Sequence, residues 1–230
     1  MSADTFKRAA AEAALQFVES GMVLGLGTGS TAAHFVDLLG GRVKQGLTIS
    51  AVATSNATRR QAIGAGIDMI EPDETTIIDL AVDGTDEADG ARNLIKGGGG
   101  ALLREKIVAN AATRFVVIAD PSKKVGQLGA FPLPVEIDRF SYGLTVRAIR
   151  EKLAAMGYEK APLKLRASPS GDFFLTDGGN YILDCALSRI TDAPALEKAL
   201  GAIPGVVESG LFIAIADDLL LAGPDGVTRL

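Results

Sequence analysis

The sequence has few residues that carry redox, metal or stacking chemistry. It contains one cysteine, one histidine and no tryptophan among 230 residues, and aromatic residues make up 5% of the chain. A single cysteine excludes an intrachain disulfide, and Cys185 lies in an apolar run, which favours a small buried hydrophobic residue over a nucleophile. His34 is the only histidine, so we expect a packed or solvent-tipped side chain there and no metal site.

Positive charge and long apolar stretches are also scarce. The net charge is −5, whereas a nucleic-acid-binding protein usually carries a basic surplus or stripe. No stretch reaches the roughly 18 apolar residues that a membrane span needs, and Asp217 with Asp218 interrupts the apolar segment 212–223. The N-terminal stretch contains acids and lacks the long apolar core of a signal peptide. We therefore expect a cytoplasmic protein that binds neither nucleic acid nor membrane.

Glycine, in contrast, is abundant. The chain has 27 glycines, and 47% of its residues are apolar, which indicates a full core with tight turns and close backbone approaches. Over the first 119 residues the apolar patterns predict strands that alternate with helices. Strands are expected at 22–26, 47–53, 67–70, 76–82 and 114–119, and helices at 4–19, 30–39, 58–65 and 101–112. Asp4 is the expected cap of the first helix, and Gly40 with Gly41 the expected end of the second.

This alternation predicts an α/β fold: an open, mostly parallel Rossmann-like sheet with helices on both faces. The pattern changes after residue 130. Further strands are expected at 133–138, 162–166, 172–175 and 181–187, and helices at 142–156 and 193–202, an order that suggests a ferredoxin-like α+β domain. We predict an α/β catalytic domain at 1–129 and 204–230, to which the C-terminal strands return, and a smaller α+β domain inserted at 130–203.

A glycine-rich turn, GLGTGST at 25–31, lies between the first predicted strand and a helix. Glycine N–H groups and a helix N-terminus suit a bound anion, and Thr28, Ser30 and Thr31 add hydroxyl donors. The alternative is a tight turn with Ser/Thr capping. A dinucleotide site is disfavoured, because Ser30 replaces the third glycine of G-x-G-x-x-G and the second strand ends without an acid. A smaller phosphate or sugar fits better.

The acidic segment DGTDE at 83–87 directly follows an apolar strand. It could be a carboxylate metal site, a site that binds sugar hydroxyls, or a solvated acidic loop. A metal site usually recruits further ligands, which the sequence does not offer. In parallel sheets ligands bind at the carboxyl ends of strands, and this position favours a functional role for Asp83 and Asp86.

The segment KGGGG at 96–100 precedes a predicted helix that contains Glu105. Four successive glycines are entropically costly, so we expect close approach of the backbone to a ligand. Taken alone, Glu105 is better explained as an ordinary first-turn acid that the helix dipole stabilises. Taken with Lys96 and the phosphate-binding turn, it completes a sugar-phosphate isomerase: a carboxylate base, a cation for the enediolate and a phosphate cradle. A glutamate base suffices for such chemistry without a metal, as in the known example of triosephosphate isomerase.

Six sequence blocks resemble ribose-5-phosphate isomerase of type A, in the order of that family and over nearly the whole chain. The blocks are GLGTGSTA (25–32), VDGTDE (82–87), IKGGGGALLREK (95–106), ADPSKK (119–124), FPLPVE (131–136) and IPGVVESGLF (203–212). The resemblance implies conversion of D-ribose 5-phosphate to D-ribulose 5-phosphate in the pentose phosphate pathway, without a cofactor. It also implies an open α/β domain with an inserted α+β domain and a homodimer or homotetramer.

The resemblance also implies a role for each matching residue. Glu105 corresponds to the catalytic base, Lys96 is expected near the developing oxyanion, and Asp83 is a candidate for ring opening or hydroxyl proton transfer. The implied substrate-binding residues are Lys7, Thr28, Gly29, Ser30, Thr31, Asp83, Gly84, Thr85, Asp86, Lys96, Gly97, Gly98, Gly99 and Lys123. Two departures are Thr85, which replaces a smaller residue, and Gly100, where the family often has alanine. Gly100 is expected to loosen the start of the helix by up to about 1 kcal/mol.

Two other functions stay open at this point. A non-catalytic sugar-phosphate sensor would keep the glycine-rich turn and the lysines but would not need Glu105 and Lys96 together. A nucleoside-cofactor enzyme such as a methyltransferase would need the missing acid at the end of the second strand. Conversion of ribose 5-phosphate in the presence of a chelator distinguishes the isomerase from both.

Overall fold

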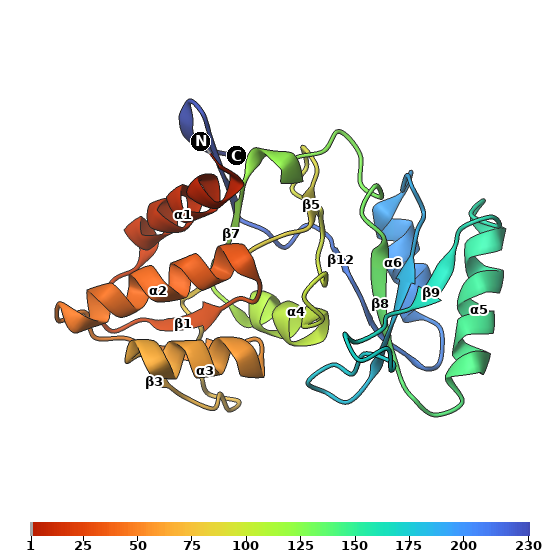
Figure 1. Cartoon of the computed structure of the whole chain (residues 1–230), viewed down its shortest axis with the longest axis horizontal. Coiled ribbons are helices and arrows are strands. Elements are labelled where there is room, and N and C mark those ends of the chain that lie inside the picture. The colour runs from red at the N-terminus through yellow and green to blue at the C-terminus, as the bar shows by residue number, and fades with distance from the viewer. Residues whose placement is uncertain (1) are drawn as a thin grey trace. The chain divides into compact units, whose positions relative to one another are not determined.

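The computed structural model describes residues 2–230 and divides them into two compact units (Figure 1). The first unit comprises the chain up to Thr85, Arg104–Lys124 and Ile215–Leu230, and the second comprises Asp86–Leu103 and Val125–Ala214. The second unit thus extends beyond the predicted insertion at 130–203. The compact units do not test the predicted domain boundaries, so the insertion at 130–203 stays a prediction.

The first unit is built on a seven-stranded sheet of order β14-β13-β7-β4-β1-β2-β3. Every neighbouring pair is parallel except β13 with β14. The strands are β1 (Val23–Leu26), β2 (Ser50–Ala53), β3 (Asp68–Met69), β4 (Leu80–Asp83), β7 (Phe115–Ala119), β13 (Asp218–Gly223) and β14 (Gly226–Arg229). This confirms the predicted α/β fold, and the parallel pairing of β13 with β7 confirms that the C-terminal strands return to this sheet. The strand order reverses between β1 and β4, where such sheets bind ligands.

Helices cover both faces of this sheet. The helices are α1 (Ala3–Ala14), α2 (Ser30–Lys44), α3 (Asn56–Ala65) and α4 (Leu102–Ala111), with short 3-10 turns η1 (Leu15–Phe17) and η2 (Pro121–Lys123). Alternate residues of β1 show the two faces. Leu24 and Leu26 join the core with Phe35 of α2, whereas a Cβ on Gly25 would lie 2.5 Å from Val108 of α4. Gly25 therefore lets α4 pack closely on the opposite face.

Three predicted helix ends in the first unit are wrong. α1 is capped by Ser2, whose side chain accepts a hydrogen bond from the Thr5 N–H, and its regular turns end at Ala14. The predicted cap, Asp4, instead lies 2.9 Å from the Nε2 atom of His34. α2 continues through Gly40 to Lys44 and does not end at this glycine. A Cβ on Gly40 would lie 2.6 Å from the Ala65 Cβ of α3, so the glycine allows the two helices to pack closely.

The second unit contains a four-stranded antiparallel sheet of order β11-β8-β10-β9. Its elements are β8 (Leu133–Ile137), α5 (Tyr142–Ala155), β9 (Leu163–Leu165), β10 (Tyr181–Cys185), α6 (Ala193–Gly201) and β11 (Val206–Ser209). This βαββαβ order with the first and third strands in the centre is the predicted ferredoxin-like arrangement. The predicted strand at 172–175 is wrong, since Phe173 forms only an isolated bridge with Ala167.

A smaller antiparallel sheet in the same unit escaped prediction because its strands are two residues long. It has the order β12-β6-β5 and consists of β5 (Glu87–Ala88), β6 (Leu94–Ile95) and β12 (Leu211–Phe212). Hydrogen bonds from its neighbours fix the segment after β6, as the Lys96 N–H donates to the Gly210 carbonyl at 2.9 Å. The sheet therefore determines where the glycine-rich segment begins.

The remaining sequence-based expectations concern Cys185 and the membrane. Cys185 is fully buried, and burial raises the pKa of its thiol to about 12, with a smaller contribution from Asp184. This confirms a small buried hydrophobic residue. Within residues 2–230, the helices are all too short or too polar to cross a bilayer.

Candidate functional site

The carboxyl ends of β1 and β4 are joined through Asp83. Its Oδ1 atom accepts hydrogen bonds from the N–H of Thr28, at 3.0 Å, and of Gly84, at 2.7 Å. The Gly27 N–H donates to the Val82 carbonyl at 2.9 Å, which holds the two strand ends together. A Cβ on Gly27 would overlap the Asp83 carboxyl group, so only glycine fits there. Asp83 is 3% exposed, so a freely solvated acidic loop is wrong at this position.

The turn after β1 presents the N-terminus of α2. Gly29 is the N-cap, with φ of +109°, and it offers no side chain to the N–H groups of the first helical turn. The Lys7 ammonium group donates to the Ser30 hydroxyl at 2.9 Å, so α1 contributes a cation to this end of α2. Helix N-termini attract anions, and the combination with a lysine fits a phosphate. The alternative of a Ser/Thr-capped turn is wrong for α2, because the cap is glycine.

The Thr28 hydroxyl turns toward β2. It lies 2.7 Å from the Thr54 hydroxyl and 3.2 Å from the Thr58 hydroxyl, which itself donates to the Gly27 carbonyl at 2.9 Å. Thr54 directly follows β2 and Thr58 lies in the first turn of α3; neither was among the predicted site residues. Their hydroxyls fix the shape of the turn through a shared network.

Two further predicted site residues of the first unit, Lys123 and Glu105, lie in short helical segments. Lys123 ends the η2 turn, directly after the sheet strand β7, and Asp120 caps that turn by accepting from the Ser122 N–H at 2.9 Å. Glu105 lies in the first turn of α4 and is 4% exposed. Because α4 packs on β1 through Val108, one turn further along, Glu105 is shielded from solvent on a rigid helix.

The glycine-rich segment after β6 is a tight turn in the second unit. The Gly100 N–H donates to the Gly97 carbonyl at 3.0 Å, and both residues have positive φ, +81° and +103°. Asp86 accepts from the Gly98 N–H at 2.7 Å. Lys96 is 2% exposed, and its ammonium group lies 5.5 Å from the centre of the Phe212 ring. The segment therefore combines a shielded cation with fixed peptide groups.

Gly100 differs from the sequence-based expectation. α4 begins at Leu102, so Gly100 lies before the helix and does not loosen its first turn. Its positive φ favours glycine, and a Cβ there would lie 2.5 Å from the Phe174 ring. Glycine at this position is a requirement of the turn and of the aromatic side chain against it.

The segment DGTDE contributes to both units. Asp83 ends β4, and Gly84 and Thr85 follow it in the first unit, whereas Asp86 and Glu87 belong to the second. Glu87 is buried and accepts from the N–H groups of Gly129, at 2.7 Å, and Phe131, at 2.5 Å, which gives it a structural role.

The predicted site residues fall into two sets accordingly. The first unit holds Lys7, Thr28, Gly29, Ser30, Thr31, Asp83, Gly84, Thr85, Glu105 and Lys123, and the second holds Asp86, Lys96, Gly97, Gly98 and Gly99. Hydrogen bonds join Thr28 to Asp83, Lys7 to Ser30, and Asp86 to Gly98. Across the described residues 2–230, no three His, Cys, Asp or Glu side chains are grouped as metal ligands.

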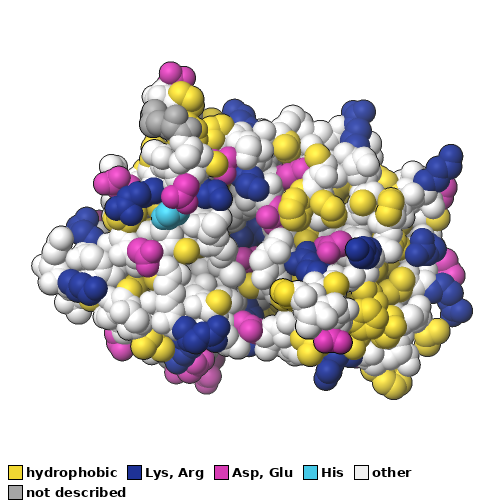
Figure 2. All heavy atoms as spheres, viewed as in Figure 1, with side chains coloured by type: hydrophobic (Ala, Val, Ile, Leu, Met, Phe, Trp, Pro, Cys, Tyr) yellow, Lys and Arg dark blue, Asp and Glu magenta, His cyan; other side chains and the backbone are white. Residues whose placement is uncertain are grey.

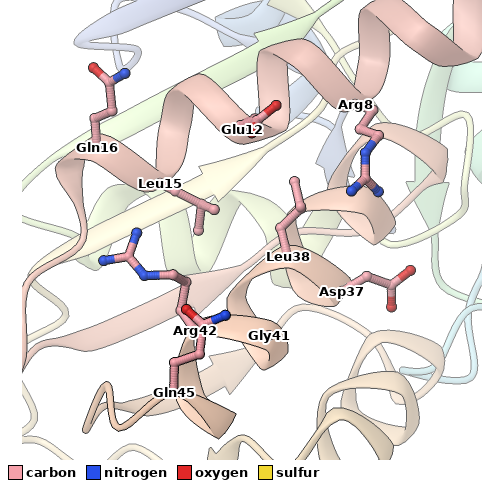
Figure 3. A pocket seen from close by; sticks show the side chains of 9 residues that line it. All are labelled: Arg8, Glu12, Leu15, Gln16, Asp37, Leu38, Gly41, Arg42 and Gln45. Atoms are coloured by element: carbon pink, nitrogen blue, oxygen red, sulfur yellow. The ribbon is translucent and has the colours of Figure 1, made fainter.

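A separate pocket of about 560 Å³ lies between α1 and α2 (Figure 3). Its charged side chains balance, with Arg8 and Arg42 against Glu12 and Asp37. It adjoins the C-terminal half of α2, away from the helix start at Ser30, and none of the predicted site residues lines it. It does not compete with the strand ends as the candidate site.

Comparison with known proteins places the chain among sugar-phosphate isomerases. The family model of ribose 5-phosphate isomerase A (phosphoriboisomerase A) matches residues 50–226. The chain is 56% identical over 227 residues to ribose-5-phosphate isomerase A of Rhodopseudomonas palustris (strain BisB18), covering 99% of this chain and 97% of the relative. It is 54% identical over 230 residues to the protein of that name from Methylorubrum extorquens, covering 100% and 97%.

Solved structures agree in fold over the full length. Ribose 5-phosphate isomerase from Plasmodium falciparum superposes with a TM-score of 0.93 at 33% identity, covering 99% of this chain and 98% of that one. Ribose 5-phosphate isomerase A from Methanocaldococcus jannaschii gives 0.91 at 39% identity, covering 100% and 99%. A further D-ribose-5-phosphate isomerase, in complex with phospho-erythronic acid, gives 0.92 at 40% identity with the same coverage. This chain therefore belongs to the ribose 5-phosphate isomerase A family.

Proposed function

We propose that the protein interconverts D-ribose 5-phosphate and D-ribulose 5-phosphate through an enediolate, in the non-oxidative pentose phosphate pathway. The observation that carries the proposal is the 56% identity to an isomerase over nearly the whole chain. The acid, the lysine and the glycine-rich turns that the chemistry requires all stand within that match. The reaction moves one proton between C1 and C2 and needs no redox partner, so we expect no cofactor and no metal.

Glu105 is the proposed base. In the aldose it takes the proton from C2, and it returns that proton to C1 to form the ketose. Its carboxylate is held on the first turn of α4 and is almost fully shielded from water. Such shielding limits proton exchange with solvent and side reactions of the enediolate. A positioned carboxylate base of this kind contributes about 10²- to 10⁴-fold to a rate.

Lys96 is the proposed partner of the oxygen that becomes negative. Its side chain is 2% exposed, and an ammonium group at a site with little water stabilises a developing charge more strongly than one at the surface. The N–H groups of Gly97, Gly98 and Gly99 are proposed to lie along the sugar. Asp83 is proposed to move a proton to or from a sugar hydroxyl, in ring opening or between the two oxygens.

The phosphate group is proposed to bind at the N-terminus of α2. Gly29, Ser30 and Thr31 offer N–H and hydroxyl groups there, and Lys7 already contacts Ser30. Lys123 is proposed as a second cation. Thr28, Gly84, Thr85 and Asp86 are proposed to bind sugar hydroxyls. Phosphate binding at a helix N-terminus needs only a few such groups, which agrees with the acidic net charge of −5.

Ribose 5-phosphate conversion in excess EDTA tests this function. We expect full activity of the wild-type protein, and we expect Glu105→Gln to reduce kcat by about 10²- to 10⁴-fold with ribose 5-phosphate binding retained. A wild-type protein that binds ribose 5-phosphate in calorimetry without converting it would instead be a sugar-phosphate sensor. Undiminished turnover in Glu105→Gln would remove Glu105 as the base.

We further propose a cytoplasmic homodimer or homotetramer. Phe140 is 85% exposed, Leu144 59% and Phe173 46%. Hydrophobic side chains also gather on the face of the second unit that Figure 2 presents. The Phe173 ring also packs edge-on against Tyr142 at 5.9 Å. Contiguous exposed apolar surface of this kind is typical of protein interfaces. Light scattering of the wild type and of Phe140→Asp tests the proposal, and a monomeric wild type would contradict it.

A further inference from the structure

Arg166, which follows the edge strand β9, forms a two-pronged ion pair with Asp184 of β10. Its Nε atom donates to Asp184 Oδ2 at 3.0 Å and its Nη2 atom donates to Oδ1 at 2.5 Å. Both side chains are largely buried, with exposed fractions of 15% for Arg166 and 26% for Asp184. The pair fixes the plane of the guanidinium group and compensates its charge, because the fork of arginine matches a carboxylate.

The third guanidinium nitrogen of Arg166 contacts the glycine-rich turn. Nη1 donates to the Gly97 carbonyl at 2.8 Å and to the Gly98 carbonyl at 3.1 Å. These residues stand 69 and 68 positions earlier in the chain. Arg166 thereby connects the four-stranded sheet to the segment that begins at Lys96.

These contacts hold one peptide unit from both sides. The Gly97 carbonyl and the Gly98 N–H belong to the same planar peptide; Arg166 binds its oxygen and Asp86 accepts its N–H at 2.7 Å. In the next peptide, Arg166 binds the Gly98 carbonyl. Because oxygen and N–H point in opposite directions across a trans peptide, the Gly99 N–H is directed away from Arg166. A hydrogen bond donated to the carbonyl also polarises the peptide, which makes that N–H a stronger donor.

An aromatic ring supports the same turn. Arg166 lies 5.9 Å from the centre of the Phe174 ring, and a Cβ on Gly100 would collide with that ring. Arg166, Asp86 and Phe174 thus restrain a run of glycines that would otherwise lose much conformational freedom on ordering.

We propose that Arg166, held by Asp184, is a positioning residue for catalysis. It sets the peptides of Gly97 to Gly99 so that the Gly99 N–H and Lys96 meet the oxygens that gain negative charge in the enediolate. The proposal rests on the proposed isomerase function, and it assigns to Arg166 no direct contact with the substrate. Fork geometry rather than positive charge carries the effect, since Asp184 compensates the charge.

Steady-state kinetics of Arg166→Lys and Asp184→Asn test this role. A preorganised donor acts mainly on the transition state, so we expect kcat to fall about 10- to 100-fold with a change in KM below about threefold. Lysine keeps the charge but loses the fork, so it should not rescue Arg166→Ala. A kcat of Arg166→Lys within about twofold of wild type overturns the proposal.

Arg114→Lys is the matched control for lost stability. Arg114 binds Asp218 through Nε, at 2.9 Å, and Nη2, at 2.5 Å, at the start of β7 and β13, the sheet edge opposite the candidate site. We expect its melting temperature to fall while kcat stays within about twofold of wild type. An equal loss of kcat in Arg114→Lys and Arg166→Lys would reduce Arg166 to a general stabilising residue and overturn the proposal.

Amide hydrogen exchange of residues 96–100 separates this proposal from the isomerase function itself. The Gly98 N–H donates to Asp86 and the Gly100 N–H to the Gly97 carbonyl, so we expect exchange at Gly98 and Gly100 to accelerate about tenfold or more in Arg166→Lys and to stay unchanged in Arg114→Lys. This measurement needs no turnover, so an inactive wild-type protein would contradict the proposed function while the exchange still tests the turn. Unchanged exchange in Arg166→Lys overturns the positioning role.

Discussion

The glycine-rich turns after β1 and after β6 use the same residue type but are held in different ways. The turn after β1 joins a sheet strand to α2, and Asp83 at the end of the neighbouring strand β4 accepts from the Thr28 N–H. The turn after β6 follows a two-residue strand of the small three-stranded sheet, and it relies on Asp86 and on Arg166, which is far along the chain. A turn at the switch point of a parallel sheet is fixed by the sheet, whereas an isolated glycine run needs side chains to fix it.

Gly27→Ala tests how far the sheet fixes the first turn and should have the largest effect. The added Cβ would overlap the Asp83 carboxyl group, and the hydrogen bond from Gly27 to Val82 prevents the strand end from moving. We expect a loss of about 1–3 kcal/mol in unfolding free energy and a loss of at least about 100-fold in kcat/KM.

Gly41→Ala is the matched control for this change. Gly41 lies within α2 and a Cβ there would meet no atom within 4 Å, so alanine should stabilise the helix by up to about 1 kcal/mol. Urea unfolding and the ribose 5-phosphate assay measure both variants. If Gly27→Ala resembles Gly41→Ala, close packing at the switch point does not define the first turn.

Asp86→Ala tests the second turn by removing the acceptor of the Gly98 N–H. We expect kcat/KM to fall by about 10- to 100-fold. Few side chains hold this turn, so the loss of one of them lets its peptides leave the positions that the reaction needs. Asp86→Asn should lose less, since its amide oxygen can still accept the hydrogen bond without the charge. Kinetics with both variants measure the difference; an equal loss in both would mean that the charge of Asp86, rather than its hydrogen bond to the turn, is what matters.

A double-mutant cycle on Gly100 and Phe174 separates backbone strain from steric overlap in the second turn. In Gly100→Ala the alanine has an unfavourable φ of +81° and its Cβ overlaps the Phe174 ring. We expect the free energy of unfolding to fall by about 1–3 kcal/mol. Phe174→Ala removes only the overlap, so the double variant should be more stable than the sum of the single losses predicts. Strictly additive losses would show that the ring does not restrict the turn.

The smallest effect is expected at Asp218, at the opposite edge of the first sheet. Burial alone would raise the pKa of Asp218, but hydrogen bonds and charges from Arg114 and Arg229 outweigh burial and hold this pKa below its usual value. A lowered folded-state pKa stabilises the protein above the unfolded-state pKa of about 4, and this stability is lost as the pH falls through the folded-state value.

Asp218→Asn should therefore lower the melting temperature at pH 7 and have progressively less effect below about pH 4. Turnover at pH 7 should stay close to that of the wild type, because this carboxylate lies away from the candidate site. A melting-temperature difference that is independent of pH would contradict the assignment of this stability to the ionised pair.

Local patterns in the sequence were sufficient for much of the architecture. Alternating apolar runs and helical periodicity predicted the α/β sheet and the ferredoxin-like βαββαβ order, because these patterns follow from which faces must be buried. The predicted strand at 172–175 was wrong because an apolar run alone does not provide a pairing partner, and Phe173 forms only one isolated bridge. The strands β5, β6 and β12 were not predicted, because two residues are too few to form a recognisable apolar pattern.

The sequence by itself determined the fold class, the family resemblance and the order of the candidate residues: Asp83 at the end of a strand, Lys96 directly after one, and Glu105 in the helix that follows. These depend on order along the chain, which a sequence contains. Tertiary structure alone decided that Gly40 serves helix contact, that Gly100 lies before α4, and that Arg166 holds the turn of Gly97 and Gly98. Such roles depend on partners distant in sequence. The residue type alone does not distinguish a glycine that ends a helix from one that allows another helix to pack closely.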